Sequence, residues 1–230
     1  MVRLEDLPRL APSAQQGYRL INSKFPPINL FDDVATAGEF EMLYELQAMT
    51  NPRLRAEVGD LGLIPVTDIP FGIPGCSYAT APFTHVNPVG SRFSRGHFGI
   101  LYVADTMDTA LTEVAYHQEA YWRNMPDLRY ERFVFRGLGC RFDEDKMVDG
   151  LALTRDHAIF DPSDYRAARA FGDTLKHEGA PGLRYHSVRQ PDAVCWALMT
   201  PRLVTSIVQA AHYEVVWNGT ITSVSRVSCP

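Results

Sequence analysis

Several motifs that would assign a function directly are missing from this 230-residue chain. It has no Gly-x-Gly-x-x-Gly turn following a predicted strand, so a Rossmann-type dinucleotide-binding domain is not expected. It also has no His-Glu-x-x-His helix, no cluster of Cys and His ligands, and no Gly-x-Ser-x-Gly elbow. We therefore expect neither a metal site nor an α/β-hydrolase fold.

Cysteine is scarce, and the four residues present (Cys76, Cys140, Cys195 and Cys229) show no Cys-x-x-Cys spacing. A disulfide framework is not expected, and reduced thiols are typical of a cytoplasmic protein. The first ten residues, MVRLEDLPRL, lack the apolar core of a signal peptide. No apolar run is long enough to span a membrane. These absences predict a cytoplasmic location.

An excess of positive charge is missing too, because the formal net charge is -5. General nucleic-acid binders usually carry a basic face, so direct nucleic-acid binding is not expected. Hydrophobic residues make up 46% of the chain and charged residues 21%, which allows a sizeable core. The length suits a single domain over 1–230. Residues 1–17 are expected to form an N-terminal arm, and 202–230 to form C-terminal strands with a hairpin.

The first half of the chain contains one clear helix signal. Thr36-Ala37-Gly38-Glu39 has the spacing of a capping box, which predicts a helix that runs to about Met49 and stops at Asn51-Pro52. A short strand is expected at Tyr18–Ile21. Proline is frequent over residues 61–90, which predicts a long irregular loop there.

The second half alternates between strand and helix signals. Asp161-Pro162 predicts the start of a helix that ends before Gly179. Asn218-Gly219 predicts a two-residue hairpin turn. The expected strands are Tyr130–Arg136, Leu183–Arg189, Val194–Met199 and Leu203–Gln209. This order is not a regular βα alternation, so we expect an α+β fold with mixed, largely antiparallel sheets and flanking helices.

The stretch Gly90–His117 joins a polar turn, an apolar run and an amphipathic segment. Phe98–Ala104 is uncharged and rich in β-branched and aromatic residues, which predicts a strand buried on both faces. Asp105–His117 has an apolar stripe of helical period. Glu113 points away from that stripe. Periodicity favours a solvated surface position for Glu113, and a position that lines a cleft is the alternative.

Five short segments share one further pattern: GYRL with Arg19, SRFS with Arg92, LYVAD with Tyr102, ALTEVAYH with Glu113, and GLRYHSVR with Ser187. Their order and spacing, from about residue 18 to 201, resemble those of the RES-domain proteins. These are bacterial toxins of toxin–antitoxin pairs that consume NAD. The resemblance implies a fold similar to that of the ADP-ribosyltransferases.

The resemblance also implies roles for these residues. Glu113, Arg92 and Ser187 would be catalytic, and Arg19, Arg92, Tyr102 and Ser187 would bind NAD as a substrate rather than a cofactor. Cleavage of the nicotinamide–ribose bond passes through a sugar cation, which a carboxylate can stabilise. Arginine binds phosphate oxygens in pairs.

Simpler interpretations of the same residues stay open. Arg19 also fits a surface strand position, Tyr102 a core tyrosine, and Ser187 a strand serine that bonds to backbone. The chain departs from the family pattern as well, since His186 stands where Pro is common. An Asn that the family often has shortly after its Ser is also absent, and the region holds Val194, Cys195 and Trp196. The pocket wall near Ser187 is therefore expected to differ from that of the family.

The resemblance implies that NAD is converted by a glycohydrolase, a phosphorylase or a protein ADP-ribosyltransferase, the last with a protein target. It also implies a cognate antitoxin with an Xre-like helix-turn-helix region. Two alternatives remain. One is a hydrolase that uses Ser187, although the adjacent His186 would point to the opposite face of a strand. The other is a non-catalytic binding module.

Overall fold

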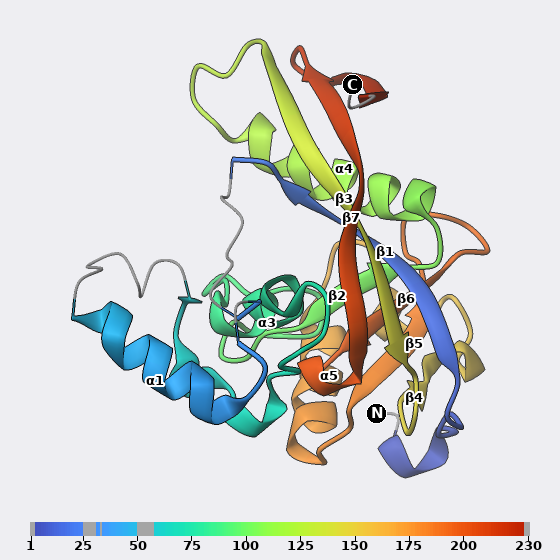
Figure 1. The fold of residues 1–230 in the computed structure, drawn as a ribbon. Helices are drawn as coiled ribbons and strands as arrows, with labels where there is room; N and C mark the ends of the chain where they lie inside the picture. The colour runs from blue at the N-terminus through green and yellow to red at the C-terminus, as the bar shows by residue number, and fades with distance from the viewer. Residues whose placement is uncertain (1–2, 25–30, 33, 50–57, 228–230) are drawn as a thin grey trace.

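A twisted sheet with helices on both faces forms the centre of this protein (Figure 1). The structure is a computed structural model, and it describes residues 3–24, 31–32, 34–49 and 58–227. The strands are β1 (Ala14–Asn22), β2 (Leu101–Ala104), β3 (Glu131–Asp143), β4 (Val148–Asp149), β5 (Gly182–His186), β6 (Val194–Leu198), β7 (Val204–Trp217) and β8 (Ile221–Val227). The helices are α1 (Ala37–Ala48), α3 (Cys76–Thr84), α4 (Met107–Arg123) and α5 (Arg166–His177). Short 3-10 turns lie at Leu4–Asp6, Leu61–Leu63, Val66–Asp68, Gly150–Ala152, Ala158–Phe160 and Pro201–Leu203.

The strands are not ordered in space as they are in the chain. Across the described part of the sheet the order is β4-β5-β6-β2-β1-β3-β7-β8. Only β4 and β5 pair in parallel, and the other neighbouring pairs are antiparallel. The predicted α+β fold with a largely antiparallel sheet is therefore confirmed. The short strand β2 lies near the middle, between β6 and β1.

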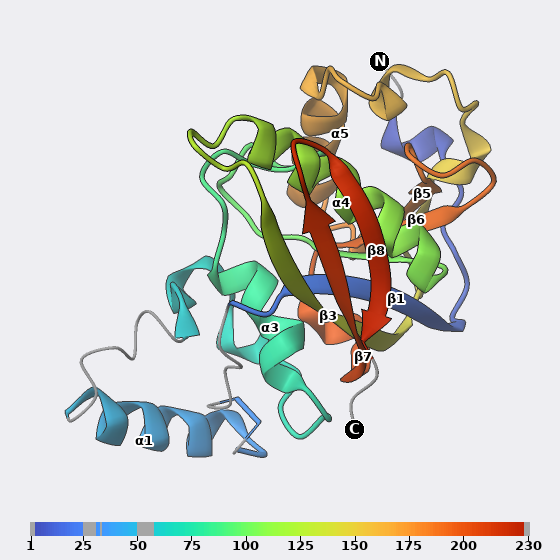
Figure 2. The ribbon, with the colours of Figure 1, turned by 90° about the horizontal axis from the view of Figure 1, so that it is seen from above.

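Two apolar cores, one on each face, hold the sheet between its helices. Along β2, Leu101 and Val103 belong to the core on the α3 side, whereas Ala104 belongs to the core on the α4 side. Such alternation follows from the two-residue period of a strand. Figure 2 shows α1 and α3 on one side of the long strands and α4 and α5 on the other. The prediction that β2 is buried on both faces is confirmed.

Two helix starts follow from their capping side chains. At α1, the Thr36 hydroxyl accepts from the Glu39 amide at 3.2 Å, and the Glu39 carboxylate accepts from the Thr36 amide at 3.2 Å. This is the predicted capping box. At α4, the Thr106 hydroxyl accepts from the Thr109 amide at 3.1 Å. The predicted stop of α1 at Asn51-Pro52 lies outside the described residues.

The long strands extend further than their sequence patterns predict. β1 starts at Ala14 rather than Tyr18, so the N-terminal arm is shorter than 1–17. It pairs with β3 from Ala14↔Asp143 to Asn22↔Phe135. β3 and β7 likewise continue to Asp143 and Trp217, because they pair along nearly their whole length. Gly137 and Gly139 interrupt the apolar alternation of β3. The sequence pattern therefore did not predict that the strand continues beyond Arg136.

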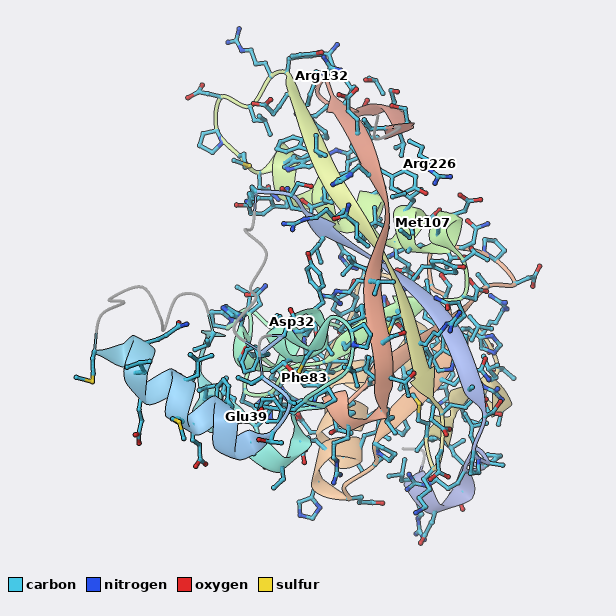
Figure 3. All side chains as sticks on the ribbon, viewed as in Figure 1. Asp32, Glu39, Phe83, Met107, Arg132 and Arg226 are labelled. Atoms are coloured by element: carbon cyan, nitrogen blue, oxygen red, sulfur yellow. The ribbon has the colours of Figure 1, made fainter. Side chains whose placement is uncertain are left out.

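Other predicted bounds were wrong for local reasons. The irregular loop predicted over 61–90 contains helix α3, which buries its apolar side although Pro82 lies inside it. Phe83 of α3, labelled in Figure 3, is among the fully buried side chains. Asp161 does not start a helix. Its carboxylate accepts from the Ser163 and Asp164 amides at 2.8 Å and 2.7 Å, which forms a separate turn before α5 begins at Arg166.

Three strand ends also differ from prediction. β2 begins at Leu101 rather than Phe98, and β5 ends at His186, so Ser187 lies on the turn that follows. The C-terminal hairpin is present, but the residues that pair across it are Trp217 and Ile221, so its turn has one residue more than predicted. Gly219 adopts φ +76°, which suits glycine at such a turn.

A buried polar network fastens β1 and the β3–β4 turn to β5 and β6. The Glu144 carboxylate, in a residue that is 4% exposed, accepts from Trp196 Nε1 at 3.1 Å and Gln15 Nε2 at 2.9 Å. Arg184 approaches the same carboxylate at 3.5 Å and pairs with Asp149 at 2.8 Å. Glu144 therefore satisfies donors from three separate strands.

Replacement of Glu144 by alanine is expected to lower the free energy of unfolding by about 3 kcal/mol. The change leaves the buried Trp196 N–H without its acceptor and Arg184 without one of its carboxylates. Urea denaturation measures the difference. Asp145→Ala is the matched control, since Asp145 makes only a 3.9 Å ion pair with exposed Lys146, and a change below roughly 0.5 kcal/mol is expected there. Equal losses in the two variants would contradict the network.

None of the described helices has the length and apolar character needed to cross a membrane.

Candidate active site

A cleft of about 490 Å³ opens beside the C-terminal end of β2, a volume that suits a small organic ligand. Four of the five predicted site residues line it: Arg19 from β1, Tyr102 from β2, Glu113 from α4 and Arg92 from the loop before β2. Ser187 does not line the cleft. It lies behind Glu113 and is hydrogen-bonded to it. The fold thus brings together residues that are far apart in the sequence.

Glu113 is held in place by the turn that follows β5. Its Oε1 atom accepts from Ser187 Oγ at 2.5 Å and from the amides of Val188 and Arg189 at 3.2 Å and 3.3 Å. Ser187 is 4% exposed, and its own amide donates to the Ala193 carbonyl. Glu113 is therefore a half-buried, oriented carboxylate, and the surface position favoured by periodicity is wrong.

Arg92 provides a buried cation in the same cleft. It is 8% exposed, and its Nη1 donates to the Asp161 and Ile159 carbonyls at 2.8 Å and 3.4 Å. Its guanidinium lies over the Tyr165 ring, 4.4 Å from the ring centroid. The Nη2 atom is buried and has no hydrogen-bond partner among the described residues. A buried N–H without a partner is unfavourable, so an anionic ligand that accepted from it would stabilise this arrangement.

Tyr102 organises the loop that carries Arg92. Its hydroxyl lies 2.9 Å from Ser91 Oγ and accepts from the Phe93 amide at 3.1 Å. Burial raises the pKa of Tyr102 to about 12, so the phenol stays neutral and can hold both partners. Gly90 begins this loop with φ +87°, and a Cβ atom there would lie 2.4 Å from the Ser94 carbonyl oxygen. Only glycine fits this close approach.

Arg19 is the second cation of the cleft. Its Nη1 donates to the Tyr102 carbonyl at 3.2 Å. Burial lowers the pKa of Arg19 from its usual value, although a guanidinium remains charged at any physiological pH. The interpretation as an ordinary surface strand residue is wrong, because the side chain points into the cleft wall.

The sequence argument missed several residues that line the cleft. Tyr165 lies beneath Arg92, and Arg169 donates to the Ser91 carbonyl at 3.0 Å. His117 lies one helical turn after Glu113, a spacing that could have identified it. Partial burial lowers the pKa of His117, while nearby Glu113 opposes the shift. Two more, Tyr185 and Cys195, come from strands β5 and β6 and carry no local signal.

Cys195 lies in the region where the chain departs from the predicted family pattern. It lines the cleft, and burial raises the pKa of its thiol well above the usual value, so the thiol is neutral. Cys195 and Tyr185 thus form an uncharged part of the wall near Ser187. Among the described residues no group of His, Cys, Asp and Glu side chains is arranged to hold a metal ion.

Comparison with known proteins gives three findings. A family model described as the RES domain matches residues 69–218, a range that contains Arg92, Tyr102, Glu113 and Ser187. The uncharacterized protein y4oC of Sinorhizobium fredii (strain NBRC 101917 / NGR234) is 32% identical over 203 residues, which are 88% of this chain and 83% of that protein. The crystal structure of the M. tuberculosis MbcT–MbcA toxin–antitoxin complex contains a similar chain, with a TM-score of 0.41 and 10% identity over 87% of this chain and 86% of that one.

Proposed function

This chain belongs to the RES-domain family, and from that membership and the geometry of its cleft we propose that it cleaves NAD at the nicotinamide–ribose bond. The observation that carries the proposal is that an oriented carboxylate, Glu113, shares one cleft with the buried, partly unsatisfied guanidinium of Arg92. NAD offers a pyrophosphate for the cation and a ribose for the carboxylate. No metal and no resident cofactor enters the proposed reaction.

The proposed reaction breaks the bond between the nicotinamide nitrogen and ribose C1′. Nicotinamide leaves with the bonding electron pair and becomes neutral, and the ribose acquires positive charge at C1′. Glu113 stabilises that charge because its carboxylate is already oriented and needs no rearrangement. An acceptor oxygen or nitrogen then bonds to C1′ and releases a proton. The acceptor is water, phosphate or a protein side chain.

The remaining residues bind NAD or hold the site in place, and do not react. The Nη2 atom of Arg92 donates to the pyrophosphate, and Arg19 adds a second positive charge. Tyr102 lines the cleft and keeps the Arg92 loop in place through the contacts of its hydroxyl with Ser91 and Phe93. Ser187 acts through Glu113, since its hydroxyl donates to the carboxylate at 2.5 Å.

A serine hydrolase is less well supported. The Ser187 hydroxyl donates a hydrogen bond to the Glu113 carboxylate, and in the part of the chain that the structure describes no histidine bonds to that hydroxyl. The ring of His186 lies 3.2 Å from the Leu153 carbonyl oxygen instead. Ser187 is also 4% exposed and does not line the cleft, so its hydroxyl is not placed to attack a bound substrate. A binding module without catalysis remains the second candidate, since the same cleft would bind NAD without cleaving it.

Incubation of the purified protein with NAD, in the presence and absence of phosphate, tests the proposal. Release of free nicotinamide is expected, and the second product identifies the acceptor as water or phosphate. Transfer to protein would appear as a mass increase on a co-incubated polypeptide. NAD that binds but stays intact would favour the binding module.

We further propose that the protein is a cytoplasmic toxin restrained by a cognate Xre-like antitoxin. An enzyme that destroys NAD would poison its own cell, so expression of this chain alone should arrest growth and lower cellular NAD. Glu113→Ala should relieve both effects, and co-expression of the adjacent gene should relieve both and give a stable complex on size exclusion. High expression with unchanged NAD would contradict the toxin proposal.

A further inference from the structure

Arg189 contacts two residues that line the cleft, Glu113 and Tyr165, although its own side chain does not line the cavity. Its backbone amide donates to Glu113 Oε1 at 3.3 Å and to Ser187 Oγ at 3.3 Å. Its guanidinium Nη2 donates to the Pro162 carbonyl and to the Tyr165 hydroxyl, the latter at 3.3 Å. Tyr165 is the residue whose ring lies under Arg92.

A third contact fixes the same guanidinium to helix α4. The Arg189 guanidinium lies over the Tyr116 ring, with its carbon 3.3 Å from the ring centroid. A guanidinium over an aromatic face is attracted by the ring and packs against it. Arg189 thus contacts α4 on one side and the segment before α5 on the other, while its backbone holds Glu113.

We infer that Arg189 is a positioning residue that keeps the 187–190 turn closed around the Glu113 carboxylate. The inference rests on the proposed function only for its effect on turnover. The turn is also held by Val188, which packs against the core, and by Gln190, whose Oε1 accepts from Thr112 Oγ1 at 3.5 Å. Among the hydrogen bonds of the described residues, however, only those of the Arg189 side chain join this turn to Pro162 and Tyr165. Without the guanidinium, the turn would keep its three donors to Glu113 but lose its connection to Pro162, Tyr165 and the Tyr116 ring.

Two variants distinguish the effect of the Arg189 hydrogen bonds from the effect of its positive charge. Arg189→Met keeps an aliphatic chain against Tyr116 and removes the hydrogen-bond donors of the guanidinium, while the backbone amide stays. Arg189→Lys keeps the charge, but a single ammonium cannot bond the Pro162 carbonyl and the Tyr165 hydroxyl with the geometry of a planar fork. Arg166→Met is the matched control, because Arg166 is 90% exposed and bonds only to Asp164.

Hydrogen exchange tests the inference without any reaction. In Arg189→Met, exchange of the Val188 and Arg189 amides should be roughly tenfold faster or more, because the closed turn protects them through Glu113. Arg166→Met should leave these two amides unchanged. Unaltered exchange in Arg189→Met would overturn the inference.

Kinetics supply the second readout. The kcat for nicotinamide release should fall roughly 10- to 100-fold in Arg189→Met, the range seen when a residue that orients a catalytic group is lost, while KM for NAD changes less. Arg189→Lys should recover only part of that loss.

A double-mutant cycle shows whether Arg189 acts through Glu113. In a Glu113→Gln background the additional Arg189→Met change should lower kcat by less than about threefold, since both changes disable one unit. If the kcat loss of the double variant equals the product of the two single-variant losses, the inference is overturned. If the wild-type protein releases no nicotinamide, the proposed function fails, and the exchange result alone decides the role of Arg189.

Discussion

Glu113→Gln is expected to reduce nicotinamide release by about 10²–10³-fold while the protein stays folded. Losses of that size follow the removal of one preorganised electrostatic contact at a transition state. The fold should survive because the glutamine carbonyl oxygen can still accept from Ser187, Val188 and Arg189, which now bond to Glu113. NAD affinity should change little, since the neutral amide fills the same space.

Release of nicotinamide under single-turnover conditions measures this loss directly. Glu119→Gln is the matched control, because Glu119 lies further along the same helix and pairs with Arg123 at 2.7 Å, away from the cleft. The control should keep nearly full activity. A folded Glu113→Gln protein with near-normal turnover would remove Glu113 from the proposed mechanism.

Arg92→Lys is expected to weaken NAD binding by about tenfold to a hundredfold. Hydrogen bonds to charged groups contribute about 1.5–3 kcal/mol, and every 1.4 kcal/mol is a factor of ten in affinity. In the wild type, Nη1 donates to the Asp161 carbonyl, whereas Nη2 has no hydrogen-bond partner among the described residues. A lysine ammonium on a similar stem cannot bond the carbonyl and the pyrophosphate in this geometry, so the preserved charge would not rescue binding.

Calorimetry in the Glu113→Gln background measures this affinity without consumption of NAD. Arg95→Lys is the control, since Arg95 belongs to the same loop but pairs with Asp173 on the surface, with a side chain that is 55% exposed. Wild-type affinity should also weaken as salt is added, because the proposed contact is between opposite charges. Equal NAD affinity of the Glu113→Gln protein with and without Arg92→Lys would give Arg92 a purely structural role.

The candidate site could be predicted from the sequence to the extent that its residues carry local signals. Arg92, Tyr102 and Glu113 lie in one continuous strand–helix unit, and the structure places them in one cleft. Periodicity alone described Glu113 wrongly, because it identifies which side of a helix is apolar but not what covers the other side. Here the cover is the turn at Ser187, 74 residues further along the chain.

The sequence argument missed other cleft residues for two separate reasons. Tyr165 and Arg169 lie within the predicted helix, whose period assigns Tyr165 to the apolar side that faces the core and does not show that this end of the helix borders a cleft. Tyr185 and Cys195 reach the cleft through strand pairing, as in Tyr185↔Cys195 across β5 and β6. The local sequence of a strand does not specify which other strand it pairs with, so this contact could not be predicted from either segment alone.

The order of residues along the chain has a consequence for protein synthesis. Strand β2 pairs with β6, through Leu101↔Leu198, so the wall of the cleft is completed by a segment made long after Arg19, Arg92 and Glu113. Pairing across so large a loop is slow compared with local folding. A nascent chain therefore presents these charged side chains before the Ser187 turn exists to orient the carboxylate. We expect the cleft to become competent only after the ribosome has passed β6. This leaves an interval in which the proposed antitoxin, if made at the same time, would meet the chain before its cleft is assembled.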